Sequence, residues 1–240
     1  MNTNINIAIA TNVSTERTTM SSLRKTSLTA GILYLLTFVS IPTLKLYSLI
    51  RGANYVVGPG PDTAVFIGSI LEIIVALTGI GTAVALYPVL KKQNEGIALG
   101  LVASRVLEAC TIFVGVAFLL SIVTLRQAGT GTDALVTSHA LVSLYDRIFL
   151  IGQSFMPAMN AFLLGSLLYQ SRLVPRVLPL IGLAGAVLLV AGDIAVLFGL
   201  IGQHAPSTAL VAIPIALWEF SLGIYLVVKG FKLSPITAGM

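Results

Sequence analysis

Five ionisable side chains that lie inside long apolar stretches are the residues of this sequence most able to do chemistry. They are Glu72, Arg105, Glu108, Asp193 and Glu219. A charged side chain at the centre of a bilayer costs about 2.5–3.5 kcal/mol on insertion scales, so each of them requires a partner or a function. Arg105 and Glu108 are three residues apart, which places them on one face of a helix, where they can pair. Carboxyl groups without a cation must be protonated, hydrogen-bonded or close to water.

Small and polar residues share helical faces with these side chains. Gly68 and Gly79 lie on the helical face of Glu72. Gln153 and Asn160 share a face in another apolar stretch and form a secondary polar pair. Because small residues mark helix–helix contacts in membranes, we expect the ionisable residues to converge on the interior of a helical bundle.

Two interpretations of this polar cluster are open from the sequence. In the first, the residues form a static lock, in which Arg105 is held by Glu108 and by one further glutamate. That second partner is Glu72 or Glu219. In the second interpretation, the residues line a small cavity that binds a cation, a proton or a polar solute near the middle of the membrane.

Enzymatic chemistry finds little support in the sequence. It contains no GxSxG nucleophile elbow, no HExxH zinc motif, no phosphate-binding loop and no paired intramembrane aspartates of the protease type. Asp133, His139, Asp146 and His204 fall in loops on one side, where an enzyme acting at that face is an open alternative. The single cysteine, Cys110, lies in an apolar stretch and is expected to be a buried thiol. We therefore predict no catalytic residue, no metal site and no cofactor.

The composition indicates that membrane spans position these residues. Of the 240 residues, 56% are hydrophobic and 10% are charged, and the mean hydropathy is +0.98. Soluble domains carry roughly 25% charged residues, so this chain has too few charges to cover a water-facing surface. The net charge of +5 comes from basic residues in short loops, which is typical of membrane topology and not of a nucleic-acid groove.

Six apolar stretches are long enough to cross a bilayer. A hydrocarbon core of about 30 Å needs about 20 helical residues, and a helix satisfies its own backbone hydrogen bonds in lipid. The stretches cover residues 28–50, 64–90, 97–125, 147–169, 177–201 and 209–228. We therefore predict an all-α, polytopic transmembrane helical bundle of about six helices in a single domain, residues 28–230. Residues 1–27 are predicted to be a disordered cytoplasmic tail and residues 231–240 a short cytoplasmic tail, and Met20 is a candidate initiator.

The distribution of basic residues predicts the orientation of the bundle. One side has Arg17, Arg24, Lys25, Lys91, Lys92, Arg172, Arg176, Lys229 and Lys232. The opposite side has Arg51, Arg126 and Arg147, with Lys45 near the end of the first stretch. Because cytoplasmic loops carry an excess of Lys and Arg, we predict that both termini are cytoplasmic (N-in/C-in).

Two loop sequences predict where helices begin. GPGPDT at residues 58–63 breaks the chain and offers Asp62 or Thr63 as a cap for the second span. In the longest outer loop, residues 127–146, the segment TDALVTSHALVSLYD predicts a helix capped by Thr132 or Asp133. That helix either lies on the membrane surface or extends the fourth span.

Four segments of the chain resemble the bacterial family catalogued as domain of unknown function 4386. They are GILYLLTFVSIP at 31–42, VALYPVLKKQNEGIALGLVASRVLEA at 84–109, SRLVPRVLPLIGLAG at 171–185 and WEFSLGIYLVVKGF at 218–231. The resemblance covers nearly everything after residue 27. It implies a short, six-helix protein of the bacterial cell membrane with no assigned activity. It draws attention to Arg105, Glu108, Trp218 and Glu219, which lie inside the matching segments.

Two functions are expected from these observations. The first is a non-enzymatic, multi-pass membrane protein with no identified biochemical role, held together by the buried polar lock. The alternative is a small proton- or cation-linked transporter, in which the four intramembrane carboxyl groups form a site beside Arg105. The expected partners are the lipid bilayer, an unidentified small molecule or ion, and a second copy of the chain in a homodimer built on the small-residue faces. No nucleic-acid partner is expected.

Overall fold

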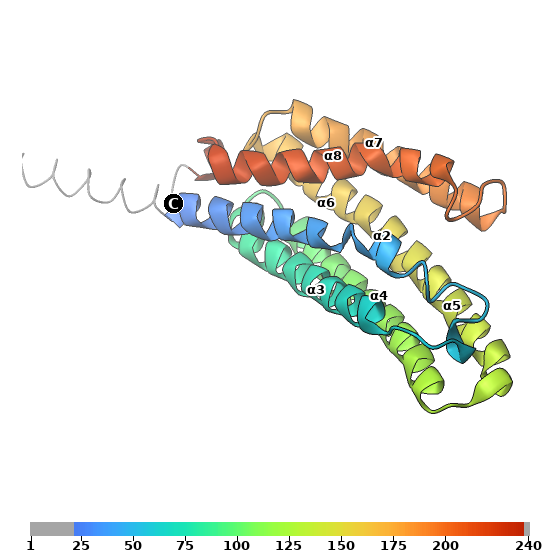
Figure 1. The fold of residues 1–240 in the computed structure, drawn as a ribbon. Coiled ribbons are helices and arrows are strands. Elements are labelled where there is room, and N and C mark those ends of the chain that lie inside the picture. The colour runs from blue at the N-terminus through green and yellow to red at the C-terminus, as the bar shows by residue number, and fades with distance from the viewer. Residues whose placement is uncertain (1–21, 238–240) are drawn as a thin grey trace, which may run out of the picture.

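Six helical spans carry most of the described chain, which comprises residues 22–237 of a computed structural model. The spans are Ser22–Leu46, α3 (Thr63–Leu90), α4 (Glu95–Gln127), a long fourth span (Gly131–Ser171), α7 (Val177–Leu197) and α8 (Pro206–Val228). The described residues contain no strand, so the prediction of an all-α bundle with about six membrane-spanning helices is confirmed. Figure 1 shows an elongated bundle in which the first span lies between α3 and α8.

The first span is not a regular α-helix throughout. Its α-helical part gives way to a 3-10 turn, η1 (Thr37–Ser40), and then to a short helix, α2 (Thr43–Leu46). Pro42 explains the break, because proline lacks the backbone N–H that would continue the helix and its ring clashes with the preceding turn. The hydroxyl group of Thr43 donates to the carbonyl oxygen of Ser40 (2.6 Å) and so satisfies a backbone group near the break.

The fourth span is longer than the apolar stretch in the sequence. It begins with α5 (Ala134–Phe149), continues through a π-helical turn, η4 (Leu150–Phe155), and ends with α6 (Met156–Ser171). The helix of the outer loop therefore extends the fourth span, which was one of the two alternatives. Asp133 precedes α5 and Asp62 precedes α3, but neither side chain makes the predicted capping hydrogen bond.

The N-terminal end of the described chain packs onto the bundle. Residues 22–27, which the sequence assigned to the tail, are helical. The guanidinium group of Arg24 donates a hydrogen bond to the carbonyl oxygen of Leu226 near the end of α8 (3.0 Å). Residues 1–21 and 238–240 lie outside the described residues, so the predicted disorder of residues 1–21 and the candidate initiator methionine stay predictions.

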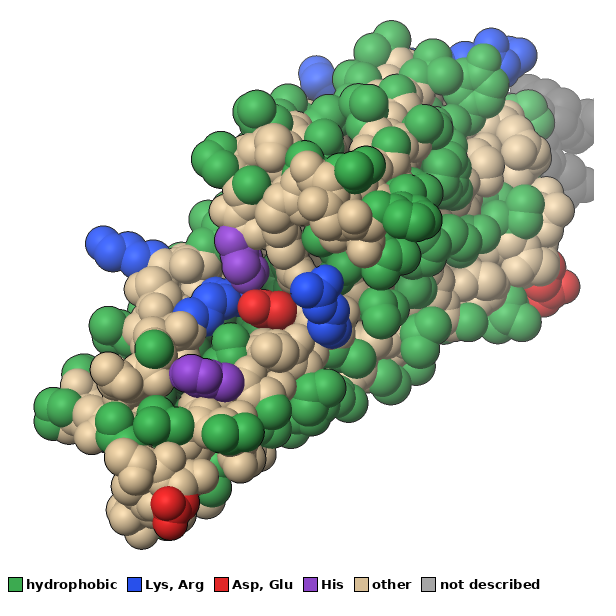
Figure 2. All heavy atoms as spheres, turned by 90° about the vertical axis from the view of Figure 1, so that its right-hand side faces the viewer, with side chains coloured by type: hydrophobic (Ala, Val, Ile, Leu, Met, Phe, Trp, Pro, Cys, Tyr) green, Lys and Arg blue, Asp and Glu red, His purple; other side chains and the backbone are tan. Residues whose placement is uncertain are grey.

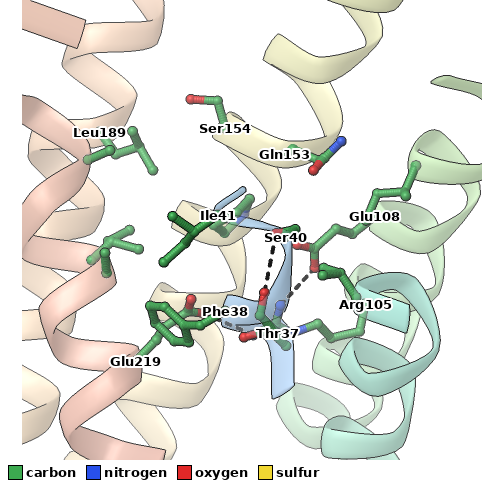
Figure 3. A pocket seen from close by; sticks show the side chains of 16 residues that line it. Thr37, Phe38, Ser40, Ile41, Arg105, Glu108, Gln153, Ser154, Leu189 and Glu219 are labelled. Carbon is green, nitrogen blue, oxygen red and sulfur yellow. Dashed lines mark hydrogen bonds and ion pairs between the residues drawn. The ribbon is translucent and has the colours of Figure 1, made fainter. Parts of the chain in front are cut away.

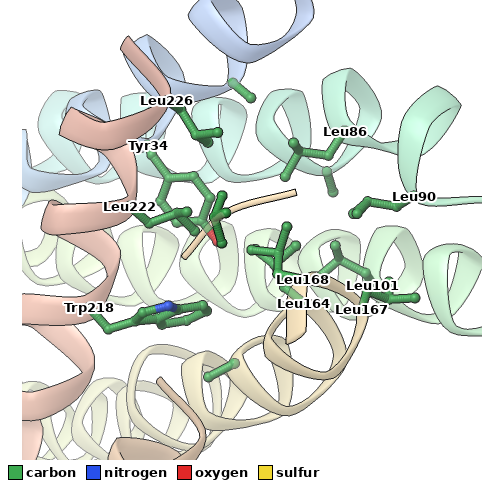
Figure 4. Packing of buried hydrophobic residues seen from close by; sticks show 14 of the residues in the cluster. Tyr34, Leu86, Leu90, Leu101, Leu164, Leu167, Leu168, Trp218, Leu222 and Leu226 are labelled. Atoms are coloured by element: carbon green, nitrogen blue, oxygen red, sulfur yellow. The ribbon is translucent and has the colours of Figure 1, made fainter. Parts of the chain in front are cut away.

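Trp218 lies in the largest apolar core cluster and has no exposed surface. Figure 4 shows this cluster, which also contains Tyr34 of the first span, Leu164 of α6 and Leu222 of α8. A Cβ atom at Gly182 of α7 would lie 2.4 Å from the indole ring, so glycine is required for this approach. The core therefore joins spans that are distant in the sequence and fixes the rotation of α8, which also carries Glu219.

The small residues predicted at helix contacts face other spans of the same chain. A Cβ atom added at Gly68 would lie 2.4 Å from the ring of Tyr47, and one added at Gly223 would lie 3.0 Å from Leu35. Small residues of this kind allow membrane helices to pack closely. These faces hold the bundle together and are not free to form the homodimer surface that the sequence suggested, so a homodimer stays a prediction.

Large apolar side chains cover the outer surface of the spans. Ile70, Leu107 and Leu188 are each about half exposed. Cys110 is exposed as well, so the expectation of a buried thiol is wrong. Because α4 is apolar around most of its circumference, its sequence does not distinguish a lipid-facing position from a buried one.

Candidate polar cavity between the spans

Arg105 of α4 is the centre of a buried ion-pair network. Its guanidinium group lies 2.9 Å from Glu108, one turn further along α4, and 3.0 Å from Glu219 of α8. It also donates a hydrogen bond to the Tyr34 hydroxyl of the first span (3.1 Å), whose ring centre is 5.5 Å away. The Arg105 side chain is 5% exposed. We call Arg105, Glu108 and Glu219 the Arg105 network; it joins α4 to α8, and the hydrogen bond to Tyr34 connects it to the first span.

Asn160 extends the Arg105 network to α6. Its side-chain N–H donates to the Glu108 carboxylate (2.8 Å), and the residue has no exposed surface. The sequence left Glu72 and Glu219 as alternatives for the second partner of Arg105. In the structure the second partner is Glu219.

Glu72 of α3 lies in a second polar group, apart from the Arg105 network. Its Oε1 atom accepts a hydrogen bond from the Tyr145 hydroxyl (2.7 Å), and Gln153 Nε2 lies 3.5 Å from the same oxygen. The Oε2 atom is buried and has no hydrogen-bond partner within residues 22–237. Glu72 therefore does not contribute to the charge balance of Arg105 by direct contact.

Asp193 of α7 forms a third polar group. Its Oδ1 atom accepts a hydrogen bond from the Ser154 hydroxyl (2.6 Å), and its Oδ2 atom is buried without a partner in the described part of the chain. The structure thus divides the predicted cluster into three groups, and Arg105 pairs with two of the four carboxylates. What these residues do stays a prediction.

A cavity of about 240 Å³ opens beside the Arg105 network (Figure 3). Arg105 and Glu108 lie on one side of it, and Glu219 lies on another, on α8. The rest of the lining is Thr37, Phe38, Ser40, Ile41, Val75, Ile112, Gln153, Ser154, Pro157, Leu189, Ala212, Ile215 and Ala216. Nine of the sixteen lining residues are therefore apolar, and the other seven are polar or charged.

The cavity wall also reaches the other two polar groups. Gln153 lines the cavity and contacts Glu72, whereas Ser154 lines it and contacts Asp193. All five ionisable residues predicted from the sequence therefore line the cavity or lie one contact behind its wall.

Two irregular helical segments meet at this cavity. η1 contributes Thr37 and Ser40, and η4 contributes Gln153 and Ser154. π-helical turns are rare and frequently occur at functional sites. In membrane transporters, interrupted helices supply polar groups at the depth of the binding site. The irregular segments are therefore where a binding function would be expected.

The charges of the Arg105 network do not balance. One guanidinium faces two carboxylates, so the network has a net charge of −1 when all three groups are ionised. An excess of negative charge in a site with low-dielectric walls attracts cations. The arrangement can thus bind a cation or exchange a proton.

Sequence reasoning missed several polar residues of the site. Tyr34, Tyr145 and Ser154 each bond to a predicted site residue but were not predicted themselves. The two tyrosines could have been proposed from the sequence, because a buried Tyr hydroxyl needs a hydrogen-bond partner. The π-helical turn that carries Ser154 has no comparable signal in the sequence.

A second arginine–carboxylate group, which we call the outer clamp, consists of Tyr55, Asp62, Arg126 and Gln127. Arg126 Nε donates to Asp62 Oδ1 (2.7 Å), and the Tyr55 hydroxyl donates to the same oxygen (2.6 Å). Gln127 Nε2 donates to Asp62 Oδ2 (2.9 Å). Burial alone would raise the pKa of the Asp62 carboxyl, but hydrogen bonds from the other clamp members outweigh it and lower the pKa to about 2. The clamp occupies the carboxylate, which explains why Asp62 does not cap α3.

The loop residues considered for an enzyme at the outer face do not form one site. Asp146 lies 3.0 Å from Arg51 and 3.2 Å from His204. His139 instead contacts the backbone carbonyl oxygen of Ala53 (3.0 Å). Figure 2 shows this end of the molecule, with both histidines and a carboxylate set among basic side chains. In residues 22–237, no three His, Cys, Asp or Glu side chains gather as metal ligands do.

Comparison with known proteins identifies a family but no characterised relative. Among curated proteins and among solved structures, none matches this sequence. The sequence model of one family, described as "Domain of unknown function (DUF4386)", matches residues 29–230. This match covers most of the chain, including the Arg105 network, and confirms the resemblance carried by the four segments. The chain therefore belongs to the family described as domain of unknown function DUF4386, and it is a multi-pass membrane protein.

Proposed function

We propose that this protein binds a small organic cation in the cavity and carries it across the membrane as a transporter. The observation that supports this function most directly is the position of the Arg105 network on the cavity wall. The network has two carboxylates for one guanidinium, so the wall carries an excess of negative charge. A cation in the cavity balances that charge.

A network that served only to hold helices together would not need this space. Protein interiors are close-packed, with few voids larger than a water molecule. The cavity of about 240 Å³ is several times the roughly 30 Å³ that one water occupies in the liquid. A buried ion pair is also weak evidence for stability, because apolar residues of similar volume are often as stabilising.

The apolar part of the lining favours an organic cation over a metal ion. Phe38, Ile41 and Ile112 line the cavity together with the carboxylates. Small-molecule sites combine a mostly apolar lining with a few polar groups that fix orientation. Hard metal cations instead require a shell of about six oxygen ligands, which an apolar wall does not supply. The charge of a short-chain alkylammonium ion can pair with the carboxylates, and its alkyl groups can pack against the apolar side chains.

Helix breaks near the cavity support movement of the spans. Pro157 lines the cavity, and Pro214 lies inside α8 beside three lining residues. η1 and η4 add two further irregular segments at the same place. Prolines and π-helical turns are the common causes of helix bending. Alternating access in transporters uses such breaks around a central site.

Uptake of tetramethylammonium into proteoliposomes tests the proposed transport. This probe is permanently charged and does not cross lipid unaided. Wild type and Glu95→Gln are expected to take it up, because Glu95 is exposed at the start of α4 and does not line the cavity. Glu219→Gln is expected to reduce uptake about tenfold or more. Equal uptake by the two variants, or wild-type uptake no greater than that of empty liposomes, would contradict the proposal.

The second candidate function is the non-enzymatic structural role that the sequence also predicted. In its favour, the hydrogen bond from Asn160 and the ion pairs of Arg105 connect α6 to α4 and α8. In this case the protein acts as an accessory membrane partner, and the network is a lock. This structural role predicts that variants of the Arg105 network fail to fold and that wild type carries no cation flux.

We further propose that both termini face the cytoplasm of a bacterial cell. In support, eight of the thirteen basic residues of the described chain gather at the end where its first and last residues lie: Arg24, Lys25, Lys91, Lys92, Arg172, Arg176, Lys229 and Lys232. Maleimide labelling of intact cells tests this orientation in a Cys110→Ser background. Thr132→Cys should be labelled and Lys92→Cys should be protected, and the reverse result would contradict the proposal.

A further inference from the structure

A hollow of about 470 Å³ lies at the end of the bundle that carries the first and last described residues. The loop between α6 and α7 forms one side, and the segment after α8 forms the other. The lining is Arg172, Val174, Pro175, Arg176, Lys232 and Leu233. We call this feature the basic hollow. It shares no lining residue with the cavity beside the Arg105 network.

Hydrogen bonds hold the two sides of the basic hollow together. The backbone N–H of Lys232 donates to the carbonyl oxygen of Leu173 (2.8 Å). The buried Ser234 hydroxyl donates to the carbonyl oxygen of Ser171. These bonds fasten the segment after α8 onto the loop and bring its lysine to the two arginines. The basic residues are therefore placed by the fold and are not scattered on flexible tails.

The charges of the basic hollow are unbalanced. Arg172, Arg176 and Lys232 line it, and its lining in the described chain includes no carboxylate. Like charges brought together repel, so an anion in the hollow is favourable. The Arg176 guanidinium lies 4.9 Å from the centre of the Tyr169 ring, a contact that orients the group. Arginine binds phosphate through paired N–H donors, and lysine adds a point charge.

Apolar side chains beside the hollow favour a lipid phosphate over a free phosphate as the anion that the hollow would bind. Leu233 lines the hollow and is 78% exposed, and Val177, the first residue of α7, is 66% exposed. Val177 begins α7 and Leu233 lies in the segment that follows α8, so both are near the level at which lipid headgroups meet acyl chains. A phospholipid contacts the basic residues with its phosphate and these apolar residues with its chains. A free phosphate uses the basic residues alone.

We propose that the basic hollow binds the headgroup of an anionic phospholipid. The lipid bridges the loop between α6 and α7 and the segment after α8, and it neutralises the repulsion among the three basic side chains. This site does not depend on the proposed transport, because it shares no residue with the cavity.

The test measures lipid binding to the full-length protein in an uncharged detergent. Phosphatidylglycerol and phosphatidylcholine are titrated separately, and bound lipid is counted by native mass spectrometry. Arg176→Gln/Lys232→Gln removes two cations from the hollow. The matched control, Lys91→Gln/Lys92→Gln, removes two exposed cations from another loop at the same end.

Wild type and the Lys91/Lys92 control are expected to bind phosphatidylglycerol with equal affinity and phosphatidylcholine weakly. Arg176→Gln/Lys232→Gln is expected to bind phosphatidylglycerol about ten- to thirtyfold more weakly than wild type. Equal binding of the two lipids by wild type, or equal weakening in both double variants, would overturn the proposal. So would displacement of phosphatidylglycerol by an equal concentration of inorganic phosphate, because the hollow would then be a site for free phosphate.

A second variant keeps the test decisive if Arg176→Gln/Lys232→Gln does not fold. Arg172→Gln removes one cation from the same hollow and is compared with Lys92→Gln. Weaker phosphatidylglycerol binding in Arg172→Gln alone supports the proposal, and equal binding in both single variants overturns it.

Discussion

The Arg105 network and the outer clamp use the same types of side chain in different surroundings. In each, a guanidinium group pairs with a carboxylate beside a tyrosine ring, at 5.5 Å for Arg105 and Tyr34 and at 5.6 Å for Arg126 and Tyr55. In the outer clamp, one guanidinium meets one carboxylate, that of Asp62, beside the loop that precedes α3. In the Arg105 network, one guanidinium meets two carboxylates on the wall of a cavity.

The difference in charge balance suggests a difference in role. A balanced pair beside a loop is sufficient to hold the start of α3 against the end of α4. A network with an extra carboxylate and an adjacent cavity is a poor fastening, because one guanidinium charge does not balance two carboxylate charges. The same features suit a site that is completed by a cation.

Removal of Arg105 should have the largest effect on stability. Arg105→Met leaves Glu108 and Glu219 buried together without a cation, which should cost about 3–5 kcal/mol. Arg126→Met in the outer clamp should cost about 1–3 kcal/mol, because it leaves a single carboxylate, that of Asp62, which keeps its hydrogen bonds from Tyr55 and Gln127. Thermal melts in detergent measure both losses.

A charge-neutral variant of the network is the control for this result. Arg105→Met/Glu108→Gln/Glu219→Gln leaves no ionised member, so it should recover much of the loss caused by Arg105→Met alone. Equal losses for Arg105→Met and Arg126→Met, or no recovery in the triple variant, would contradict the account of the network as an unbalanced charge group.

Acid should weaken the outer clamp. The pKa of the Asp62 carboxyl is about 2 in the folded protein, below the ordinary value of 3.8. Because the folded pKa is the lower one, the stabilising contribution is present above about pH 4 and is lost as the pH falls towards 2. Its size is up to about 2 kcal/mol.

The difference in melting temperature between wild type and Asp62→Asn measures this loss. It should be constant from neutral pH down to about pH 4 and should shrink between about pH 4 and pH 3. A difference that persists unchanged to about pH 3 would show that the Asp62 carboxylate does not stabilise the clamp.

Filling the cavity should have the smallest effect on stability and a large effect on binding. Ala212 of α8 lines the cavity, and a leucine there occupies the space without removing a charge. Ala212→Leu should change the free energy of unfolding by less than about 1 kcal/mol and weaken tetramethylammonium binding about tenfold or more. Ala209→Leu, at an exposed position of the same helix, should leave binding unchanged. Equal binding by the two variants would place the cation site elsewhere.

The six spans could be predicted from the sequence because hydropathy and backbone hydrogen bonding leave few alternatives in lipid. The pairing of Arg105 with Glu108 followed from their spacing on one helix. The break in the first span was not predicted, although Pro42 inside the apolar stretch 28–50 is a local signal for it. In each case the sequence signal is local and depends on one helix.

The features that could not be predicted depend on contacts between helices. Whether Glu72 or Glu219 reaches Arg105 is decided by the rotation of α8, which the packing of Trp218 against Gly182 fixes. The π-helical turn that brings Gln153 and Ser154 to the cavity depends on the surroundings of the fourth span. A uniformly apolar sequence gives little information about such rotations, because lipid-facing and buried positions use the same residue types.

Equilibrium binding of tetramethylammonium to Glu219→Gln shows whether the unbalanced Arg105 network forms a cation site. This variant removes the extra carboxylate and gives the Arg105 network the charge balance of the outer clamp. Isothermal titration of wild type, Glu219→Gln and the exposed control Glu95→Gln should show equal affinity for wild type and the control. Glu219→Gln should bind about tenfold more weakly or worse. Saturable binding that is unchanged in Glu219→Gln, or no binding by wild type, would contradict the claim that the unbalanced network is a cation site.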